Sequence, residues 1–295
     1  MNTPHPKPFL KWPGGKRWLA PAIGLLLGDR PQCYLEPFLG GGALFLALNP
    51  HTATLADASA DLINCYMMVR DQPERLIRRL ARLRVSRTTF LAMRQSEPRD
   101  PLAKATRFLY LNRTAFNGLF RVNRQGQFNV PFGCKPGTTL CDASAIRTSS
   151  RRLRKAHLAT SDFRASLDGA NHCDVVYVDP PYTVMHNNNA FRRYNEHLFS
   201  WTDQLALADL LIRLARIGTR VIVSNANHPS VSALYPRLLF ARAALRRPSN
   251  VAADPASRCF ADELLLLTRS VVDDEEYLHE LLLDLRLAST QPCSS

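Results

Sequence analysis

The sequence lacks the features of membrane and secreted proteins. Among its 295 residues, no stretch approaches the roughly 18 consecutive apolar residues that a membrane-spanning helix needs. The amino terminus has no apolar run ahead of a small-residue cleavage site, so no secretory signal is expected. The seven cysteines are scattered, with no C-x-x-C pair and no histidine at zinc-finger spacing. We therefore expect a cytoplasmic protein with reduced thiols, no membrane association and no bound metal.

Two nucleotide-binding patterns are also missing. The glycine turn Phe38–Gly42 does not contain G-x-G-x-x-G, and no phosphate-binding Lys-Ser/Thr follows it. This excludes the dinucleotide fingerprint and the P-loop. The turn nevertheless follows a strand predicted at Tyr34-Leu35, and Asp57 ends the next predicted strand, Thr52–Ala56. The Asp57 carboxylate in this position suits hydrogen bonds to the ribose hydroxyls of a nucleoside. The alternative interpretation is that the glycines form only a tight turn and bind no ligand.

Positive charge is concentrated in one third of the chain. The segment Asp61–Lys155 contains 20 Lys/Arg and 6 Asp/Glu, a net charge of +14, whereas the rest contains 18 and 19. A basic segment between near-neutral flanks indicates an inserted module that binds a polyanion. The alternative is a solvated arginine-rich surface, since Arg supplies 32 of the 38 cations.

The order of the predicted elements indicates an α/β fold. Hydrophobic patterns predict strands at 34–35, 52–56, 157–160, 175–178, 220–223, 238–245 and 263–267, and helices at 43–48, 61–83, 103–111, 202–217 and 273–288. This alternation favours a mostly parallel sheet, which binds ligands beyond the carboxyl ends of its strands. Five polar residues fall at such predicted ends: Glu36, Asp57, Asp162, Asp179 and Asn225.

The segment Asp179-Pro180-Pro181-Tyr182 follows one of these strands. Two prolines stop the strand and hold the carbonyls of Asp179 and Pro180 rigid. A carboxylate, a fixed carbonyl and an aromatic ring can accept both hydrogens of a planar exocyclic amine while the base stacks on the tyrosine. Such hydrogen bonds localise the nitrogen lone pair toward an electrophile by positioning and preorganisation. The alternative is an ordinary turn after a strand.

Two further segments have the composition of a binding surface. Phe9–Lys16 (FLKWPGGK) has the residues of a lid over a ligand, although Trp12 can also cover the edge of a core. Leu111–Gly133, predicted to form an ordered loop or hairpin around 116–133, mixes Arg and Asn with Phe and Leu inside the basic segment. Arg reads guanine, Asn reads adenine and apolar side chains can wedge between base steps, so the composition favours nucleic acid over a solvated loop.

Together these motifs resemble the DNA adenine methylase (Dam) family, the alpha-type, D12-class N6-adenine methyltransferases. The matching segments run in the family's order over residues 9–267: FLKWPGGK, YLEPFLGGGA, ADASADLINCY, FLYLNRTAFNGLFRVNRQGQFNVPFG, SDF, DPPY, VSNANHP and DELLLL. The resemblance implies a Rossmann-like S-adenosylmethionine-dependent methyltransferase sheet with helices on both faces, formed by residues 1–58 and 156–295. Residues 59–155 would form an inserted, mainly helical DNA-recognition domain.

The resemblance also implies which residues bind the methyl donor and the base. S-adenosylmethionine would be bound by Trp12, Lys16, Gly40, Asp57, Asp162, Phe163 and Asp179. Asp179, Pro180, Pro181 and Tyr182 would hold an adenine flipped out of double-stranded DNA, because N6 is otherwise paired and stacked. In-line attack of N6 on the methyl group would need no metal and no covalent enzyme intermediate.

The recognition segment resembles that of Dam itself. DNA contacts are implied for Lys11, Phe116, Asn117, Leu119, Arg121, Asn123 and Pro131, with 5′-GATC-3′ as the expected target. Phe116 replaces a tyrosine of Dam, ADAS replaces the more usual ADIN, and GGG replaces G-x-G. None of these changes removes a carboxylate or a required glycine.

The sequence is also compatible with several other functions. The same reaction could serve a restriction–modification system at another target, or the methylated amine could be N4 of cytosine. A catalytically idle DNA-binding protein is the alternative from another class, and the intact Asp179–Tyr182 segment argues against it. A protein glutamine methyltransferase would carry N-P-P-Y. We expect a monomer or a weakly self-associating protein in a bacterial nucleoid or phage-infected cell.

Overall fold

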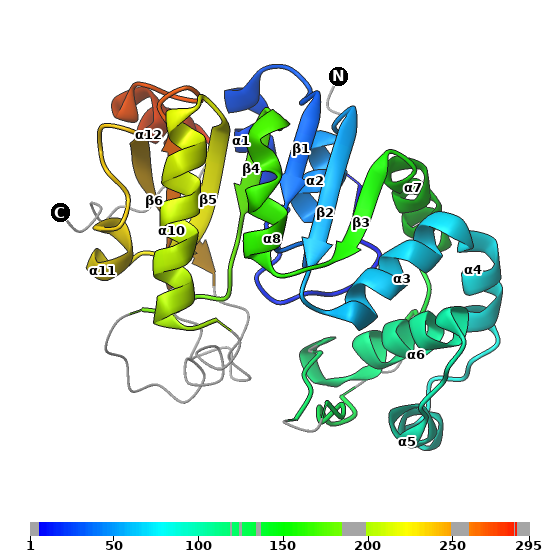
Figure 1. Ribbon diagram of the computed structural model, residues 1–295. Coiled ribbons are helices and arrows are strands. Elements are labelled where there is room, and N and C mark those ends of the chain that lie inside the picture. The colour runs from blue at the N-terminus through cyan, green and yellow to red at the C-terminus, as the bar shows by residue number, and fades with distance from the viewer. Residues whose placement is uncertain are drawn as a thin grey trace. The chain divides into compact units, whose positions relative to one another are not determined.

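The computed structural model describes residues 6–118, 120–123, 126–133, 137–184, 199–248, 260–285 and 287 (Figure 1). The chain divides into two compact units. Unit 1 comprises Met1–Ala20, Leu39–Asn49 and Ala53–Thr160, and unit 2 comprises Pro21–Phe38, Pro50–Thr52 and Ser161–Ser295. The predicted recognition domain, residues 59–155, lies within unit 1, and the assignment of a separate role to it stays a prediction.

In the described part of the chain, seven strands form one mixed sheet in the order β3-β2-β1-β4-β5-β7-β6. Their bounds are β1 Cys33–Glu36, β2 Thr52–Asp57, β3 Ala156–Thr160, β4 Val175–Val178, β5 Arg220–Ala226, β6 Phe240–Pro248 and β7 Phe260–Thr268. The pairs β1–β4, β2–β3 and β4–β5 are parallel, whereas β5–β7 and β6–β7 are antiparallel. The predicted α/β class with a mostly parallel sheet is confirmed.

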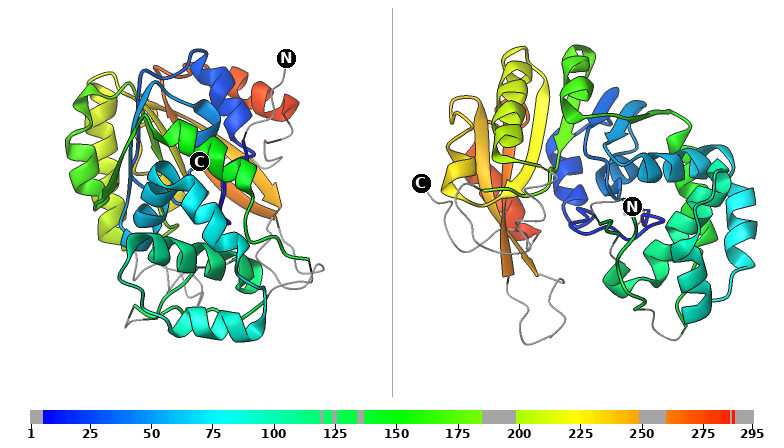
Figure 2. Two further views of the ribbon diagram at one scale, coloured as in Figure 1. Left: turned by 90° about the vertical axis from the view of Figure 1, so that its right-hand side faces the viewer. Right: turned by 60° about the horizontal axis from the view of Figure 1, so that its bottom comes forward.

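Unit 2 has helices on both faces of its strands. Helices α8 (Phe163–Asp168) and α10 (Trp201–Arg216) cover one face, and α1 (Ala20–Leu27) and α12 (Glu275–Asp284) lie on the other (Figure 2). Every residue of β4, with the sequence VVYV, is buried, as expected for a strand covered on both faces. Helix α10 begins at a capping box, in which Ser200 and Asp203 exchange hydrogen bonds. The unit also contains the short helices η2 (Ala170–His172) and α11 (Pro229–Ser232).

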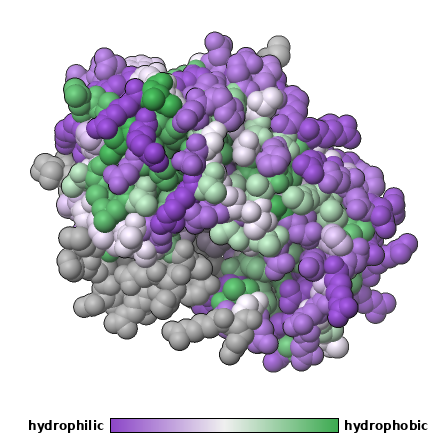
Figure 3. All heavy atoms as spheres, in the orientation of Figure 1, coloured by the Kyte–Doolittle hydropathy of each residue, from purple (hydrophilic) through white to green (hydrophobic). Residues whose placement is uncertain are grey.

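Unit 1 is mainly helical outside β2 and β3. Its helices are α2 Ala43–Leu48, α3 Ala60–Asp71, α4 Pro73–Ala81, α5 Arg87–Gln95, α6 Pro101–Thr114, η1 Phe116–Gly118 and α7 Ala143–Leu153. A small core forms where Phe90 and Tyr110 pack with Phe128 and Val130 of the predicted hairpin segment. The surface of α4 and its neighbours seen in Figure 3 is predominantly hydrophilic, which is consistent with the charge of this part of the chain.

Two helix predictions need correction, and helices α1, α5, α7 and α8 were not predicted. The single helix expected at 61–83 is two helices, because Gln72 ends α3 and Pro73 begins α4, where a proline needs no amide donor. Helices α5 and α7 had no counterpart in the prediction, although Ser86 and Asp142 form N-cap hydrogen bonds that could have indicated them. The helix expected at 273–288 is shorter, since Asp274 is its N-cap and Asp284 its last residue.

None of the helices in the described part of the chain combines the length and the apolar character that a bilayer crossing needs.

Candidate functional site

The glycine turn after β1 and the end of β2 form a compact structure within unit 1. Asp57 accepts hydrogen bonds from the Gly40 amide (3.0 Å) and the Ser59 amide (2.9 Å), one on each carboxylate oxygen. The Tyr66 hydroxyl donates to the Gly40 carbonyl at 3.1 Å. Burial raises the pKa of Asp57, and the two amide hydrogen bonds act in the opposite direction. The carboxylate is thus held by the backbone, with lone pairs left for further donors.

Trp12 lies directly against this turn. A Cβ atom added at Gly40, whose φ is +45°, would lie 2.7 Å from Nε1 of the indole, and one at Gly41 would lie 3.2 Å from the Trp12 Cβ. Glycine is therefore required at position 40 both for the left-handed backbone and for the close approach of the ring. Lys16 is buried, and its ammonium group donates to the Gly14 carbonyl at 3.1 Å. The predicted residues Trp12, Gly40 and Asp57 are thus brought together.

In unit 2, Asp162 and Phe163 begin helix α8. Asp162 is the N-cap and accepts from the Arg164 amide at 2.9 Å, while Phe163 is buried. The Phe163 ring stacks on Phe38 with centroids 5.4 Å apart and 25° between the planes. The Arg164 guanidinium lies over the Phe163 ring, 4.4 Å from its centroid, and pairs with Asp203. Apolar ring area therefore lies beside an exposed carboxylate at this helix start.

The segment Asp179–Tyr182 follows β4 directly, at the carboxyl end of that strand. Pro180 is buried, Asp179 and Tyr182 are half-buried, and the Tyr182 side chain packs against the core of unit 2. The next residue, Thr183, donates from its hydroxyl to the Phe199 carbonyl at 2.6 Å. The carboxylate and the aromatic ring are therefore set on a short, well-fixed segment.

Polar side chains gather at the carboxyl ends of the neighbouring parallel strands in unit 2. Glu36, which ends β1, is buried and accepts from the Tyr34 hydroxyl at 2.9 Å. Asn225 in β5 is also buried and donates to Gln204 at 3.1 Å. Tyr177 lies on β4 between these strands, and its pKa is raised by burial and by the Asp179 carboxylate. Three of the five predicted strand-end residues, Glu36, Asp179 and Asn225, thus lie on one edge.

The recognition segment of unit 1 forms a hairpin-like structure, as predicted. Isolated bridges join Ala115 with Phe132 and Val122 with Phe128. The Arg121 guanidinium donates to Asn129 at 2.9 Å, and Asn123 accepts from the Gln127 amide at 2.9 Å. The side chains of Phe116, Asn117, Arg121 and Pro131 are exposed, and Leu119 lies outside the described residues.

Asn112 of α6 connects this segment to the amino-terminal segment. Its side chain is fully buried, accepts from the Lys11 amide at 2.9 Å, and donates to the carbonyls of Lys11 (2.6 Å) and Gly118 (3.1 Å). The Lys11 side chain therefore passes so close to Gly118 that an added Cβ would lie 2.5 Å from its Cδ. Sequence reasoning missed Asn112, because a mid-helix asparagine carries no pattern that distinguishes it.

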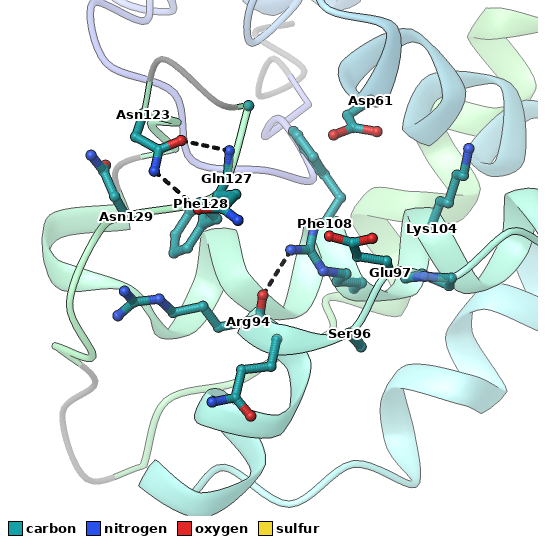
Figure 4. A pocket seen from close by; sticks show the side chains of 14 residues that line it. Asp61, Arg94, Ser96, Glu97, Lys104, Phe108, Asn123, Gln127, Phe128 and Asn129 are labelled. Carbon is teal, nitrogen blue, oxygen red and sulfur yellow. Dashed lines mark hydrogen bonds between the residues drawn. The ribbon is translucent and has the colours of Figure 1, made fainter.

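A polar pocket of about 590 Å³ lies beside the hairpin within unit 1. Figure 4 shows Asn123, Gln127 and Asn129 from the hairpin on one side, and Glu97 and Lys104 on the other. Arg94 extends from α5 below the hairpin residues. The Arg107 guanidinium donates to the carbonyls of Met93 and Arg94. Among the lining residues, Asn123 was predicted as a DNA contact, and Phe128 and Asn129 belong to the segment predicted to bind nucleic acid. The cations of α5 and α6 were not predicted, since they did not stand out in an arginine-rich segment.

Comparison with known proteins shows the family. Residues 12–246 match the model of the D12 class N6 adenine-specific DNA methyltransferases. The chain is 38% identical over 245 residues to the type II methyltransferase M1.LlaDCHI of Lactococcus lactis subsp. cremoris, covering 79% of this chain and 86% of that protein. It is 30% and 31% identical to the DNA adenine methylases of Haemophilus influenzae and Escherichia coli K12, over 88% of this chain and 93% and 94% of theirs.

The match covers the glycine turn, Asp57, the hairpin and the Asp179–Tyr182 segment, which are the features that carried the resemblance. The chain therefore belongs to the D12 class of N6 adenine-specific DNA methyltransferases.

Proposed function

We propose that this enzyme transfers the methyl group of S-adenosylmethionine to N6 of an adenine flipped out of double-stranded DNA, within 5′-GATC-3′. The observation that carries the proposal is the position of Asp179-Pro180-Pro181-Tyr182 immediately after the buried strand β4. A carboxylate, a rigid carbonyl and a ring on one short segment suit a planar aromatic amine.

Each unit, taken by itself, has side chains whose chemistry suits part of a nucleoside methyl donor. In unit 1, Asp57 keeps lone pairs for ribose hydroxyls, Gly40 presents backbone without a side chain, and Trp12 supplies an aromatic surface. The buried Lys16 ammonium adds a positive charge that suits the donor's carboxylate. In unit 2, Asp162 and Phe163 combine a carboxylate with ring area, which suits an adenine ring. Asp179 completes the proposed set.

The bound donor supplies an electrophilic methyl group on a sulfonium sulfur. Asp179 accepts a hydrogen bond from N6, and the carbonyl of Pro180 accepts the second N6 hydrogen. These bonds draw the amine out of conjugation and aim its lone pair, while Tyr182 stacks on the base and holds its plane. Flipping is needed because N6 of a paired adenine is inaccessible inside the duplex.

The residues that we propose to contact DNA belong to unit 1. Phe116, Asn117, Arg121 and Pro131 are exposed on the recognition segment, and Lys11 is exposed on the amino-terminal segment that Asn112 joins to it. Arg121 is the candidate for bidentate guanine recognition, and Phe116 is the candidate wedge. Leu119 and Asn123 complete the proposed contacts. Arg94 and Lys104 in the polar pocket are further candidates for phosphate contacts.

The test compares Asp179→Ala with Asp168→Ala, which removes an exposed carboxylate at the end of α8. We expect Asp179→Ala to abolish tritiated methyl transfer to DNA while DNA binding, measured by fluorescence anisotropy, largely survives. Asp168→Ala should retain both. Turnover by Asp179→Ala would refute the assigned role.

Sequencing of the product DNA with detection of modified bases identifies the base and the site together. N6-methyladenine within 5′-GATC-3′ is the expected result. Another adenine-containing site would refute only the target sequence, whereas N4-methylcytosine would refute the assignment of the base.

A further inference from the structure

Two cysteines and a histidine that the proposed function does not use lie together in unit 2. The Sγ atoms of Cys33 and Cys173 are 2.9 Å apart, although 140 positions separate the residues in the sequence. His172 is next to Cys173, and the ligand atoms of all three side chains lie within 4.8 Å of one another. We propose that Cys33, His172 and Cys173 form a binding site for a thiophilic divalent metal ion, with Zn²⁺ as the expected ion.

The backbone around the three side chains is fixed by hydrogen bonds and by an ion pair of the neighbouring Asp174. Asp174 accepts from the amides of Gln32 (3.1 Å) and Cys33 (2.9 Å) and pairs with Arg220 at 3.0 Å. The Cys173 amide donates to the Ala170 carbonyl at 2.9 Å. The start of β1 and the approach to β4 are thereby tied together, which keeps the two sulfurs adjacent.

The donor set suits zinc. Zn²⁺ binds thiolates at about 2.3 Å and imidazole at about 2.0–2.1 Å, and sites with two cysteines, one histidine and an open fourth position are an established arrangement. Tetrahedral geometry with such bonds places two sulfurs about 3.7 Å apart, so the Cys33 and Cys173 sulfurs need to separate by less than 1 Å. Small rotations of two side chains achieve this.

The exposure of the three residues provides an entry path and a fourth ligand. Cys173 is buried, Cys33 is half-buried and His172 is exposed, so the imidazole side of the site faces solvent. Water can therefore occupy the fourth position. Two thiols that served only as small apolar side chains in a core would be buried together, without an exposed imidazole beside them. Here one thiol is half-buried and an exposed histidine lies within reach of both.

The site is remote from the proposed chemistry. Cys173 precedes β4 and Asp179 follows it, and six residues of extended chain span about 20 Å. A metal ion there would cross-link the starts of β1 and β4 rather than touch the methyl group or the base. Because binding requires the folded arrangement, zinc should raise the thermal stability of the protein. The proposal is independent of the proposed function.

The test measures zinc uptake by the full, reduced, metal-free protein in competition with a chromophoric chelator. We expect one equivalent to bind to the wild type, Cys33→Ser and Cys173→Ser to lose it, and His172→Ala to weaken it at least tenfold. Cys141→Ser, which alters a half-buried cysteine of unit 1, is the matched control and should bind like the wild type. Zinc should also raise Tm of the wild type and of this control only.

Cobalt binding to the wild type provides a second readout that does not depend on any variant's folding. Thiolate-to-cobalt charge-transfer absorption in the near ultraviolet supports the site, and its absence overturns it. The proposal is also overturned if zinc uptake is absent, or if it persists undiminished in both serine variants. If the reduced protein takes up no zinc and mild peroxide instead yields a Cys33–Cys173 disulfide, the pair is a redox couple and the metal site is refuted.

Discussion

Replacing Asn112 by alanine should destabilise unit 1 and loosen its DNA-contacting segment. The buried amide makes three hydrogen bonds, one to the Lys11 amide and one each to the carbonyls of Lys11 and Gly118. At a net contribution of about 1 kcal/mol for each bond, the expected loss is about 3 kcal/mol. The loss of stability will exceed this value if water cannot reach the backbone groups of Lys11 and Gly118 that lose their hydrogen bonds.

The assay is urea denaturation of the wild type and the variant, followed by circular dichroism and analysed at a common m-value. The matched control is Asn64→Ala, because that amide makes a single hydrogen bond to the Pro101 carbonyl, at 3.0 Å in an exposed place. The control should stay within about 0.5 kcal/mol of the wild type. If Asn112→Ala does so too, the bridging role assigned to Asn112 is wrong.

Asn112→Ala should also weaken discrimination between cognate and altered DNA sites, since Lys11 and Gly118 are no longer joined. An unaltered preference in a variant that is destabilised as expected would mean that Asn112 supports only the fold.

Three further predictions concern the two proposed ligands. Gly40→Ala should lower the affinity for S-adenosylmethionine, measured by calorimetry, at least tenfold, because a Cβ at this position meets the Trp12 ring. The control is Gly28→Ala, which has a similar φ of +67° but no atom within 4 Å of the added Cβ. This control should bind S-adenosylmethionine like the wild type. Arg121→Ala should relax discrimination at one base pair by about 1–3 kcal/mol in methylation rates on single-substituted sites, and an unchanged preference would contradict a base contact. The logarithm of DNA affinity should fall linearly with the logarithm of salt concentration, by about 0.9 for each phosphate contacted, whereas a flat response would mean that the positive charge of 61–155 does not face DNA.

The elements that depend on local pattern could be predicted from the sequence. Strand β4 is four apolar residues ended by two prolines, and α2 was predicted with its observed bounds, because a glycine turn and an apolar run define it. Pro73 was the informative residue that the prediction of one long helix overlooked. Helices α5 and α7 were missed because their apolar residues are few: α5 buries only Phe90.

The long-range parts of the site could not be predicted in this way. Trp12 and Gly40 are 28 positions apart in the sequence, Lys11 and Asn112 are 101 apart, and Cys33 and Cys173 are 140 apart, yet the fold brings each pair into contact. No spacing rule connects such residues. The family resemblance identified several of them by type, and their partners became visible only once the backbone was placed.

Lys11 and Trp12 are consecutive, so one short segment carries a proposed DNA contact and a proposed donor contact. Asn112 fixes the backbone of that segment to Gly118, at the start of the recognition hairpin. A ligand that orders either part therefore lowers the entropy that the other ligand must remove on binding. Any such coupling is reciprocal: the factor by which DNA strengthens donor binding equals the factor by which the donor strengthens DNA binding. The enzyme's two substrates would then communicate through a single buried amide, that of Asn112.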